Sequence, residues 1–235
     1  MAWSAKPSGG YALGSSESNG NIDEIWSILN SYGYTMEAAA GVLGNMHAES
    51  GINPWRWQGD TYGMNRGYGL VQFTPASGYI QLSGTMPNLS TSTTTAGASP
   101  DDGSRQTYCF TSNELRKWQP SAWRPYWDRN TYASLYAQRA AWLATYGNGS
   151  RITMSQFAQV TDVEAATFFM LACFEGPAVP NQSVRYGYAQ TIYAYLSGSP
   201  TPPTPPQPPI PPTGDGLPVW LLWALKNNLD KMLKT

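Results

Sequence analysis

Residues 40–54 have the sequence Ala40-Gly41-Val42-Leu43-Gly44-Asn45-Met46-His47-Ala48-Glu49-Ser50-Gly51-Ile52-Asn53-Pro54, and this stretch decides the fold of the chain. Thr35, five residues upstream, is of a type that caps helix N-termini, and Gly51 suits the left-handed position that follows a helix. Pro54 prevents the helix from resuming. We therefore predict a helix that begins at Thr35 and ends at about Ser50.

Glu49 lies in the last turn of this predicted helix, on the same stripe as Val42, Asn45 and Met46. A carboxylate there faces the negative end of the helix dipole, and partial burial would add a desolvation cost. Both effects favour the protonated carboxylic acid. A neutral acid is what a glycosidase needs to protonate a leaving glycosidic oxygen, so Glu49 is the candidate general acid.

The predicted helix also contains Gly41 and Gly44. Each glycine lowers helix stability by roughly 1 kcal/mol relative to alanine. Close packing of another helix against these positions would offset the cost. Packing beneath an active-site floor would serve, and ordinary tight packing elsewhere would serve equally.

A second informative stretch, Gly67-Tyr68-Gly69-Leu70-Val71-Gln72-Phe73-Thr74, lies just before Pro75. Its short alternation of side chains and its glycines predict one or two short strands with tight turns. The Ser/Thr/Gly-rich residues 83–107 are expected to form a long loop or insertion.

Other segments show helical patterning. A helix is expected over 21–33, again after Asn113, most strongly across 130–146, and finally over 184–196. The sequence Thr161-Asp162-Val163-Glu164 matches a capping box and should open a buried helix over 165–174.

Taken in order, residues 40–54 and 67–74 resemble the signature of the phage tail lysozyme family, which is similar to goose-type lysozymes and lytic transglycosylases. A third element, Phe174-Glu175-Gly176-Pro177 followed by Arg185, Ala189 and Tyr193, resembles the closing part of the same domain. The resemblance covers about residues 21–197. Two features depart from the family pattern: Phe73 stands where the family commonly has Trp, and residues 83–107 resemble an insertion.

The resemblance implies an α+β, lysozyme-like fold, mostly helical with a small β-hairpin region. It also implies cleavage of the bond between N-acetylmuramic acid and N-acetylglucosamine in peptidoglycan, with Glu49 as the acid. Gln72 would line the groove and bind an acetamido group or orient water. Tyr68 could contact the sugar or pack on the hairpin, and Asn53 is a further candidate substrate-binding residue.

A second carboxylate could activate water or balance an oxocarbenium charge. Asp60 lies opposite the helix, although it could simply shape a turn. Glu175 is the other candidate, although it could instead pair with Arg185 and fix a helix junction. If neither carboxylate assists water, the 6-hydroxyl of the sugar could attack, and the enzyme would be a lytic transglycosylase.

Composition and single residues exclude several functions. A net charge of −1 with 12% charged residues gives no electrostatic basis for binding nucleic acid. His47 is the only histidine, it points away from Glu49 on a helix, and no zinc motif is present, so we predict no metal and no cofactor. Cys173 is expected as a buried thiol, and whether Cys109 meets it stays open.

Four segments are expected along the chain. Residues 1–20 would form a flexible N-terminal arm, 21–197 the lysozyme-like domain, 198–216 a proline-rich linker, and 217–235 an amphipathic helix. This last helix should dock on other tail proteins or on copies of itself. Such an organisation predicts a virion-borne tail muramidase that opens the bacterial cell wall locally when the phage genome enters the host. The alternative from another class is a structural virion protein that binds glycan without cleaving it.

Overall fold

A computed structural model describes residues 3–83, 102–121 and 127–198. The described part is mostly helical. Its elements are α1 (Ser16–Ser31), α2 (Met36–Ser50), the 3₁₀ turn η1 (Gln58–Asp60), α3 (Ala76–Ser83), α4 (Asp102–Thr111), α5 (Ala133–Tyr146), α6 (Met154–Phe157), α7 (Val163–Met170), the π turn η2 (Leu171–Glu175) and α8 (Gln182–Gly198). The predicted segments 198–216 and 217–235 lie outside the described residues, apart from residue 198.

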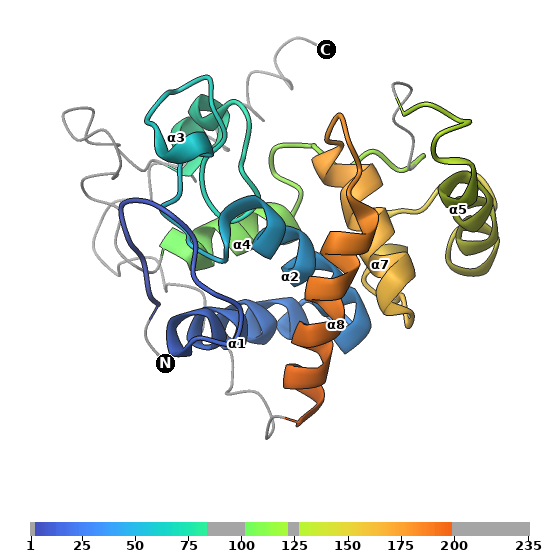
Figure 1. Ribbon diagram of the computed structural model, residues 1–235, viewed down its shortest axis with the longest axis horizontal. Helices are drawn as coiled ribbons and strands as arrows, with labels where there is room; N and C mark the ends of the chain where they lie inside the picture. Colours follow the sequence, from blue (N-terminus) through green and yellow to red (C-terminus); the bar gives the residue numbers. More distant parts are fainter. Residues whose placement is uncertain (1–2, 84–101, 122–126, 199–235) are drawn as a thin grey trace, which may run out of the picture.

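Helix α2 lies at the centre, with α1, α7 and α8 packed around it (Figure 1). Its ends are those the sequence predicts: the Thr35 side chain accepts a hydrogen bond from the Ala38 amide, and Gly51 adopts the left-handed conformation with φ 62°. Residues 38–46 of the helix are all buried. A helix buried on every side carries no amphipathic stripe, so its position depends on close contact with its neighbours.

Gly41 and Gly44 make that close contact, as expected. A Cβ at Gly41 would lie 2.6 Å from the Ala166 carbonyl carbon on α7, and one at Gly44 would lie 2.8 Å from the Ala189 nitrogen on α8. No real Cβ approaches backbone that closely. The two glycines therefore let α7 and α8 rest directly on the backbone of α2.

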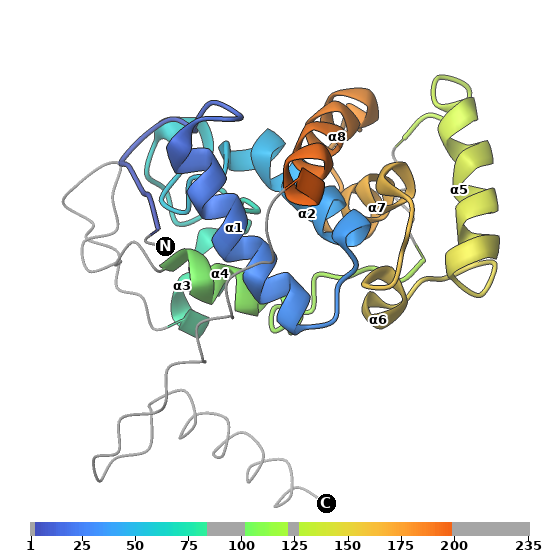
Figure 2. The ribbon, with the colours of Figure 1, turned by 90° about the horizontal axis from the view of Figure 1, so that it is seen from below.

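Figure 2 shows α5 at one edge of the molecule and α1 at the opposite side of α2. Helices α5 and α8 confirm the patterning over 130–146 and 184–196. The buried helix after Thr161 is also present, but Asp162 and not Thr161 is its N-cap, because the Asp162 side chain accepts the Ala165 amide. That helix ends in the π turn η2.

Three expectations about local structure were wrong. In the described residues, the region 52–80 contains no hairpin, only the isolated bridges Trp57–Tyr68 and Tyr68–Phe73. Helix α4 occupies 102–111, part of which was expected as loop, and the chain after Asn113 forms turns. The remainder of the expected insertion, residues 84–101, lies outside the described residues.

Residues 3–15 pack against the body of the protein, unlike the flexible arm that was expected. Trp3 is buried and its indole nitrogen donates to Ser104 at 2.9 Å. The Tyr11 amide donates to the Gly51 carbonyl at 2.9 Å. Helix α1 begins at Ser16, five residues before the predicted start, with Ser15 as its N-cap.

Candidate active site

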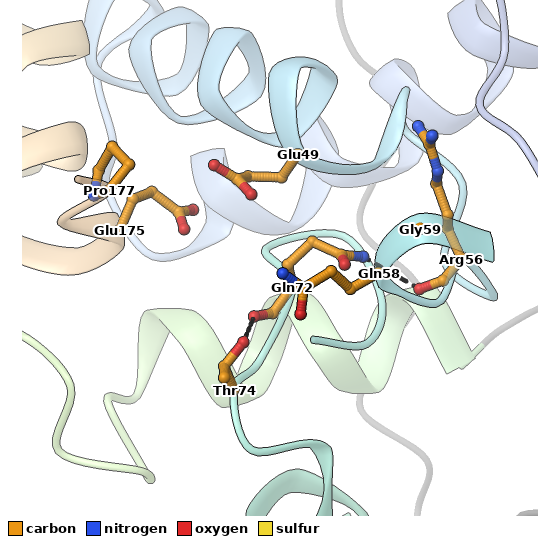
Figure 3. A pocket seen from close by; sticks show the side chains of 8 residues that line it. All are labelled: Glu49, Arg56, Gln58, Gly59, Gln72, Thr74, Glu175 and Pro177. Atoms are coloured by element: carbon orange, nitrogen blue, oxygen red, sulfur yellow. Dashed lines mark hydrogen bonds between the residues drawn. The ribbon is translucent and has the colours of Figure 1, made fainter. Parts of the chain in front are cut away.

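The C-terminal end of α2 forms one wall of a pocket, and Glu49 points into it (Figure 3). The Glu49 side chain is 21% exposed. The other residues of the lining come from the segment after α2, from the turn around Gln72 and from the end of η2; they are Arg56, Gln58, Gly59, Gln72, Thr74, Glu175 and Pro177. A carboxyl group, an amide and a second carboxyl group thus face one space.

Gln72 lies across the pocket from Glu49 (Figure 3), in what we call the Gln72 turn, residues 67–73. Its Nε2 donates to the Arg56 carbonyl at 3.0 Å and to the Gly69 carbonyl at 2.9 Å. Because these two bonds use both N–H groups of the amide, its Oε1 is left to accept a hydrogen bond from substrate or water.

The backbone of Gln72 is held in an uncommon conformation, with φ 46°. A residue with a side chain pays roughly 1–2 kcal/mol for this left-handed geometry. The strain is maintained by the bonds that close the turn: Tyr68 and Phe73 exchange backbone hydrogen bonds, and the Gln72 amide donates to the Gly69 carbonyl. These bonds therefore fix the direction in which the Gln72 side chain points.

Glu175 ends the π turn η2, and the left-handed Gly176 follows it with φ 53°. Its side chain extends toward Glu49 from the wall opposite Arg56 (Figure 3). The π turn inserts one extra residue into the helical path. This turn places Glu175 at the pocket, as the sequence analysis expected for one of its two roles.

Arg185 on α8 holds the Glu49 carboxyl group. Its Nη2 donates to Glu49 Oε1 at 2.5 Å, and its Nη1 donates to Asn45 Oδ1 at 3.0 Å. Asn45 is fully buried and its own Nδ2 donates to the Gly41 and Thr167 carbonyls. Arg185, a predicted partner of Glu175, thus bonds Glu49, a contact that no sequence motif indicates.

The structure places the remaining candidates outside the pocket lining. Asp60 Oδ1 accepts the Gly9 amide at 2.7 Å and Arg56 Nε at 3.3 Å. Asn53 is fully buried and bonds the backbone of Lys6 and Gly9. Asp60 and Asn53 therefore fasten the N-terminal residues to the body of the protein.

Tyr68 is fully buried, and its hydroxyl donates to Asp102 Oδ2 at 3.0 Å. Its ring packs between those of Trp57 and Tyr79. Tyr68 thus contributes to the support of the Gln72 turn, and it does not face the pocket.

The cysteines and the histidine lie away from this chemistry. Cys109 and Cys173 are both free and buried, and burial raises the pKa of Cys109 to about 12. His47 packs edge-on against Tyr188, with ring centroids 4.5 Å apart, and burial lowers its pKa.

Among the described residues, no cluster of three or more His, Cys, Asp or Glu side chains could hold a metal ion. In the same residues, no helix is long and apolar enough to span a membrane.

Comparison with known proteins assigns this arrangement to a family. The sequence model of the phage tail lysozymes matches residues 20–196, which include most of α1, the whole pocket lining and nearly all of α8. The chain belongs to the phage tail lysozyme family.

The chain is also similar to morphogenesis protein 1 of Bacillus phage B103, with 46% identity over 61 residues. The alignment covers 26% of this chain and 17% of the phage B103 protein. The chain therefore matches only a small part of that longer relative. The residues before position 20, including those that bond Asn53 and Asp60, lie outside the family match.

Proposed function

We propose that this chain is a tail muramidase that hydrolyses the bond between N-acetylmuramic acid and N-acetylglucosamine, with Glu49 as the general acid. The observation that carries the proposal is the convergence of Glu49, Gln72 and Glu175 on one pocket (Figure 3). Glycosidic hydrolysis commonly uses an acid and a second carboxylate, and Gln72 adds an acceptor for a substrate N–H.

In the proposed reaction, Glu49 gives its proton to the leaving glycosidic oxygen as the C–O bond breaks. The acid becomes a carboxylate, and the guanidinium of Arg185 compensates its new negative charge. The Gln72 Oε1 accepts a hydrogen bond from the acetamido N–H of the sugar or from the attacking water. Hydrogen bonds hold both Glu49 and Gln72 in place, so the two side chains need little rearrangement before the bond breaks.

Glu175 is the proposed base that activates the attacking water, because it lines the pocket and Asp60 does not. The water loses a proton to Glu175 as its oxygen bonds to the anomeric carbon. The products are a reducing end on one fragment and a free hydroxyl on the other.

We further propose that the protein acts from the virion, opening the wall locally when the genome enters the host. The family and the phage B103 relative support this setting. The predicted linker 198–216 and helix 217–235 would attach the domain to other tail proteins.

Zymography on purified peptidoglycan tests the acid. Glu49→Gln should abolish clearing, while Glu37→Gln on the first turn of the same helix should clear like the wild type. Glu37→Gln is a matched control because its remaining oxygen still accepts the bond from the Tyr193 hydroxyl. Clearing by Glu49→Gln would refute the assignment, and an inactive wild type would favour a glycan-binding structural protein.

Mass analysis of the soluble products tests the reaction class. Hydrolysis gives muropeptides with reducing ends, as the proposal requires. Anhydro ends would show that the sugar 6-hydroxyl attacks instead of water, and would assign the protein as a lytic transglycosylase.

A further inference from the structure

A buried polar cluster lies behind the Gln72 turn, on the side away from the pocket lining. It consists of Tyr68, Tyr79, Asp102 and Gln106, each at most 6% exposed. Two of its members, Asp102 and Gln106, are on α4, in a part of the chain whose sequence gives a weak structural signal. Buried polar groups cost stability unless they are bonded, so such a cluster is expected to have a specific use.

Gln106 binds three separate groups with one amide. Its Oε1 accepts the Leu70 amide at 2.7 Å, and its Nε2 donates to the Pro54 carbonyl at 2.7 Å and to Asp102 Oδ2 at 2.8 Å. Leu70 lies two residues before Gln72, and Pro54 lies five residues after Glu49. The Gln106 amide therefore connects the Gln72 turn to the segment that follows α2.

Asp102 fixes the orientation of that amide. Its carboxylate also accepts the hydroxyls of Tyr68 at 3.0 Å and Tyr79 at 2.6 Å. An acceptor-only carboxylate forces the Nε2 of Gln106 toward it, which leaves Oε1 directed at Leu70. Asp102, together with the Pro54 carbonyl, thus selects which end of the Gln106 amide meets the turn.

The turn fits this contact closely. A Cβ at Gly69 would lie 2.1 Å from Gln106 Oε1, and the φ of Gly69 is 80°, so only glycine suits this position. On the other side, the Ser50 hydroxyl donates to the Leu70 carbonyl at 3.0 Å. Both polar groups of the Leu70 backbone are therefore bonded, the N–H to α4 and the carbonyl to Ser50, which follows Glu49 directly.

We infer that Gln106, oriented by Asp102, is a positioning residue that sets the location of Gln72 opposite Glu49. The inference rests on the proposed function for its effect on turnover. Gln106 does not line the pocket; it acts through Leu70 and the Gln72 turn.

Two substitutions in the full chain test the inference. Gln106→Leu keeps the approximate size of the side chain and removes all three bonds. Thr107→Val is the matched control, because its buried hydroxyl bonds only the Gly103 carbonyl within α4. We expect the turnover of soluble peptidoglycan strands to fall about 10–100-fold in Gln106→Leu, with a change in their Kd below about threefold, whereas Thr107→Val stays within about twofold on both measures. Equal turnover in the two folded variants would overturn the inference.

Gln106→Glu gives an independent measurement if Gln106→Leu does not fold. One Glu oxygen can still accept the Leu70 amide, but the other faces Asp102 and the Pro54 carbonyl, where it needs a proton to bond. The other groups near Asp102 and the introduced carboxyl group are Tyr68 and Tyr79, whose hydroxyls bond Asp102, and Arg105, which acts on Asp102 through its charge. The ratio of variant to wild-type turnover should therefore rise as the pH falls. A ratio near one at all pH values would contradict the inference.

Hydrogen exchange separates this inference from the proposed function. The Leu70 amide should exchange at least about tenfold faster in Gln106→Leu than in Thr107→Val, whether or not the protein cleaves glycan. A wild type that does not cleave refutes the proposed function alone. Unchanged exchange at Leu70 would refute the role of Gln106 alone.

Discussion

Substitution of Gly44 by alanine should separate α2 from α8 and disturb the site at its base. In the structure a Cβ at position 44 would lie 2.7 Å from the Ala189 Cβ and 2.8 Å from both the Ala189 nitrogen and the Arg185 carbonyl oxygen. Ordinary contacts of a Cβ begin at 3.4 Å. Because two of these atoms are backbone, no side chain can rotate away, and α8 has to move by roughly half an ångström.

Overpacking of this kind costs typically about 1–3 kcal/mol, and contact with backbone places it near 3. Alanine returns about 1 kcal/mol of helix propensity, so the net loss is about 2 kcal/mol. In a domain of this size the Tm should fall by about 4–8 °C. The moving segment contains Arg185, which holds Glu49, so turnover should also fall about tenfold.

Gly187→Ala is the matched control. Gly187 is on the same helix α8, and a Cβ there would meet nothing within 4 Å. This variant should gain up to about 1 kcal/mol, which makes the stability gap between the two variants about 3 kcal/mol. Urea unfolding and muropeptide release would be measured on both full-length chains. Equal stability of Gly44→Ala and Gly187→Ala would refute the close-packing argument.

Three further predictions concern individual side chains. Arg185→Lys should keep a cation near Glu49 but lose the planar guanidinium that bonds Glu49 and Asn45 together, lowering turnover about tenfold and stability by about 1–3 kcal/mol; wild-type values for both would show that charge alone suffices. Glu175→Gln should lower turnover about 100-fold or more, while Asp60→Asn stays within about threefold, and the reverse order would make Asp60 the base. Burial lowers the pKa of His47 below 6.5 in the folded protein. As the pH falls, the unfolded chain therefore binds a proton at His47 before the folded protein does, and the free energy of unfolding decreases from pH 6.5 down to the folded pKa. His47→Phe should remove that loss, and equal pH slopes of unfolding free energy in variant and wild type would contradict the assignment.

The sequence predicts best what is decided locally. The bounds of α2 follow from a cap at Thr35 and a left-handed glycine at Gly51, each of which acts within one helical turn. Glu49 and Gln72 were found as site candidates because they lie in short motifs with fixed spacing, and the structure brings both to one pocket.

The sequence contains no comparable motif for contacts between distant residues. Arg185 lies 136 residues from Glu49, and nothing in either segment indicates that they meet. Helix α4 was missed for a related reason: part of the face that it buries is polar, with Asp102 and Gln106 one helical turn apart. A search for hydrophobic periodicity does not detect a helix that binds through hydrogen bonds.

The expected hairpin failed because period-two alternation also describes a tight turn. Tyr68 and Phe73 both point into the core and exchange backbone hydrogen bonds, as paired strand residues would. The four residues between them leave no room for further pairs, and Gly69 and Gln72 both have positive φ. The segment is consequently held by bonds to Gln106 on α4, to Ser50 and to the Arg56 backbone, and not by a sheet.

Glycine allows backbone conformations with positive φ, and it also lets two backbones approach closely. In this chain the close approach is what holds the site in place. The glycines before Ser15 predicted a flexible arm, yet a Cβ at Gly10 would lie 2.7 Å from the Gly51 Cα, so this pair serves close approach. Gly41 and Gly44 do the same for α7 and α8. Glu49 thus lies at the end of a helix on which α7, α8 and Gly10 rest against bare backbone, and these contacts leave little space for the helix to shift. Since a 1 Å displacement can cost about 100-fold in rate, rigidity at these glycines is part of the proposed catalysis.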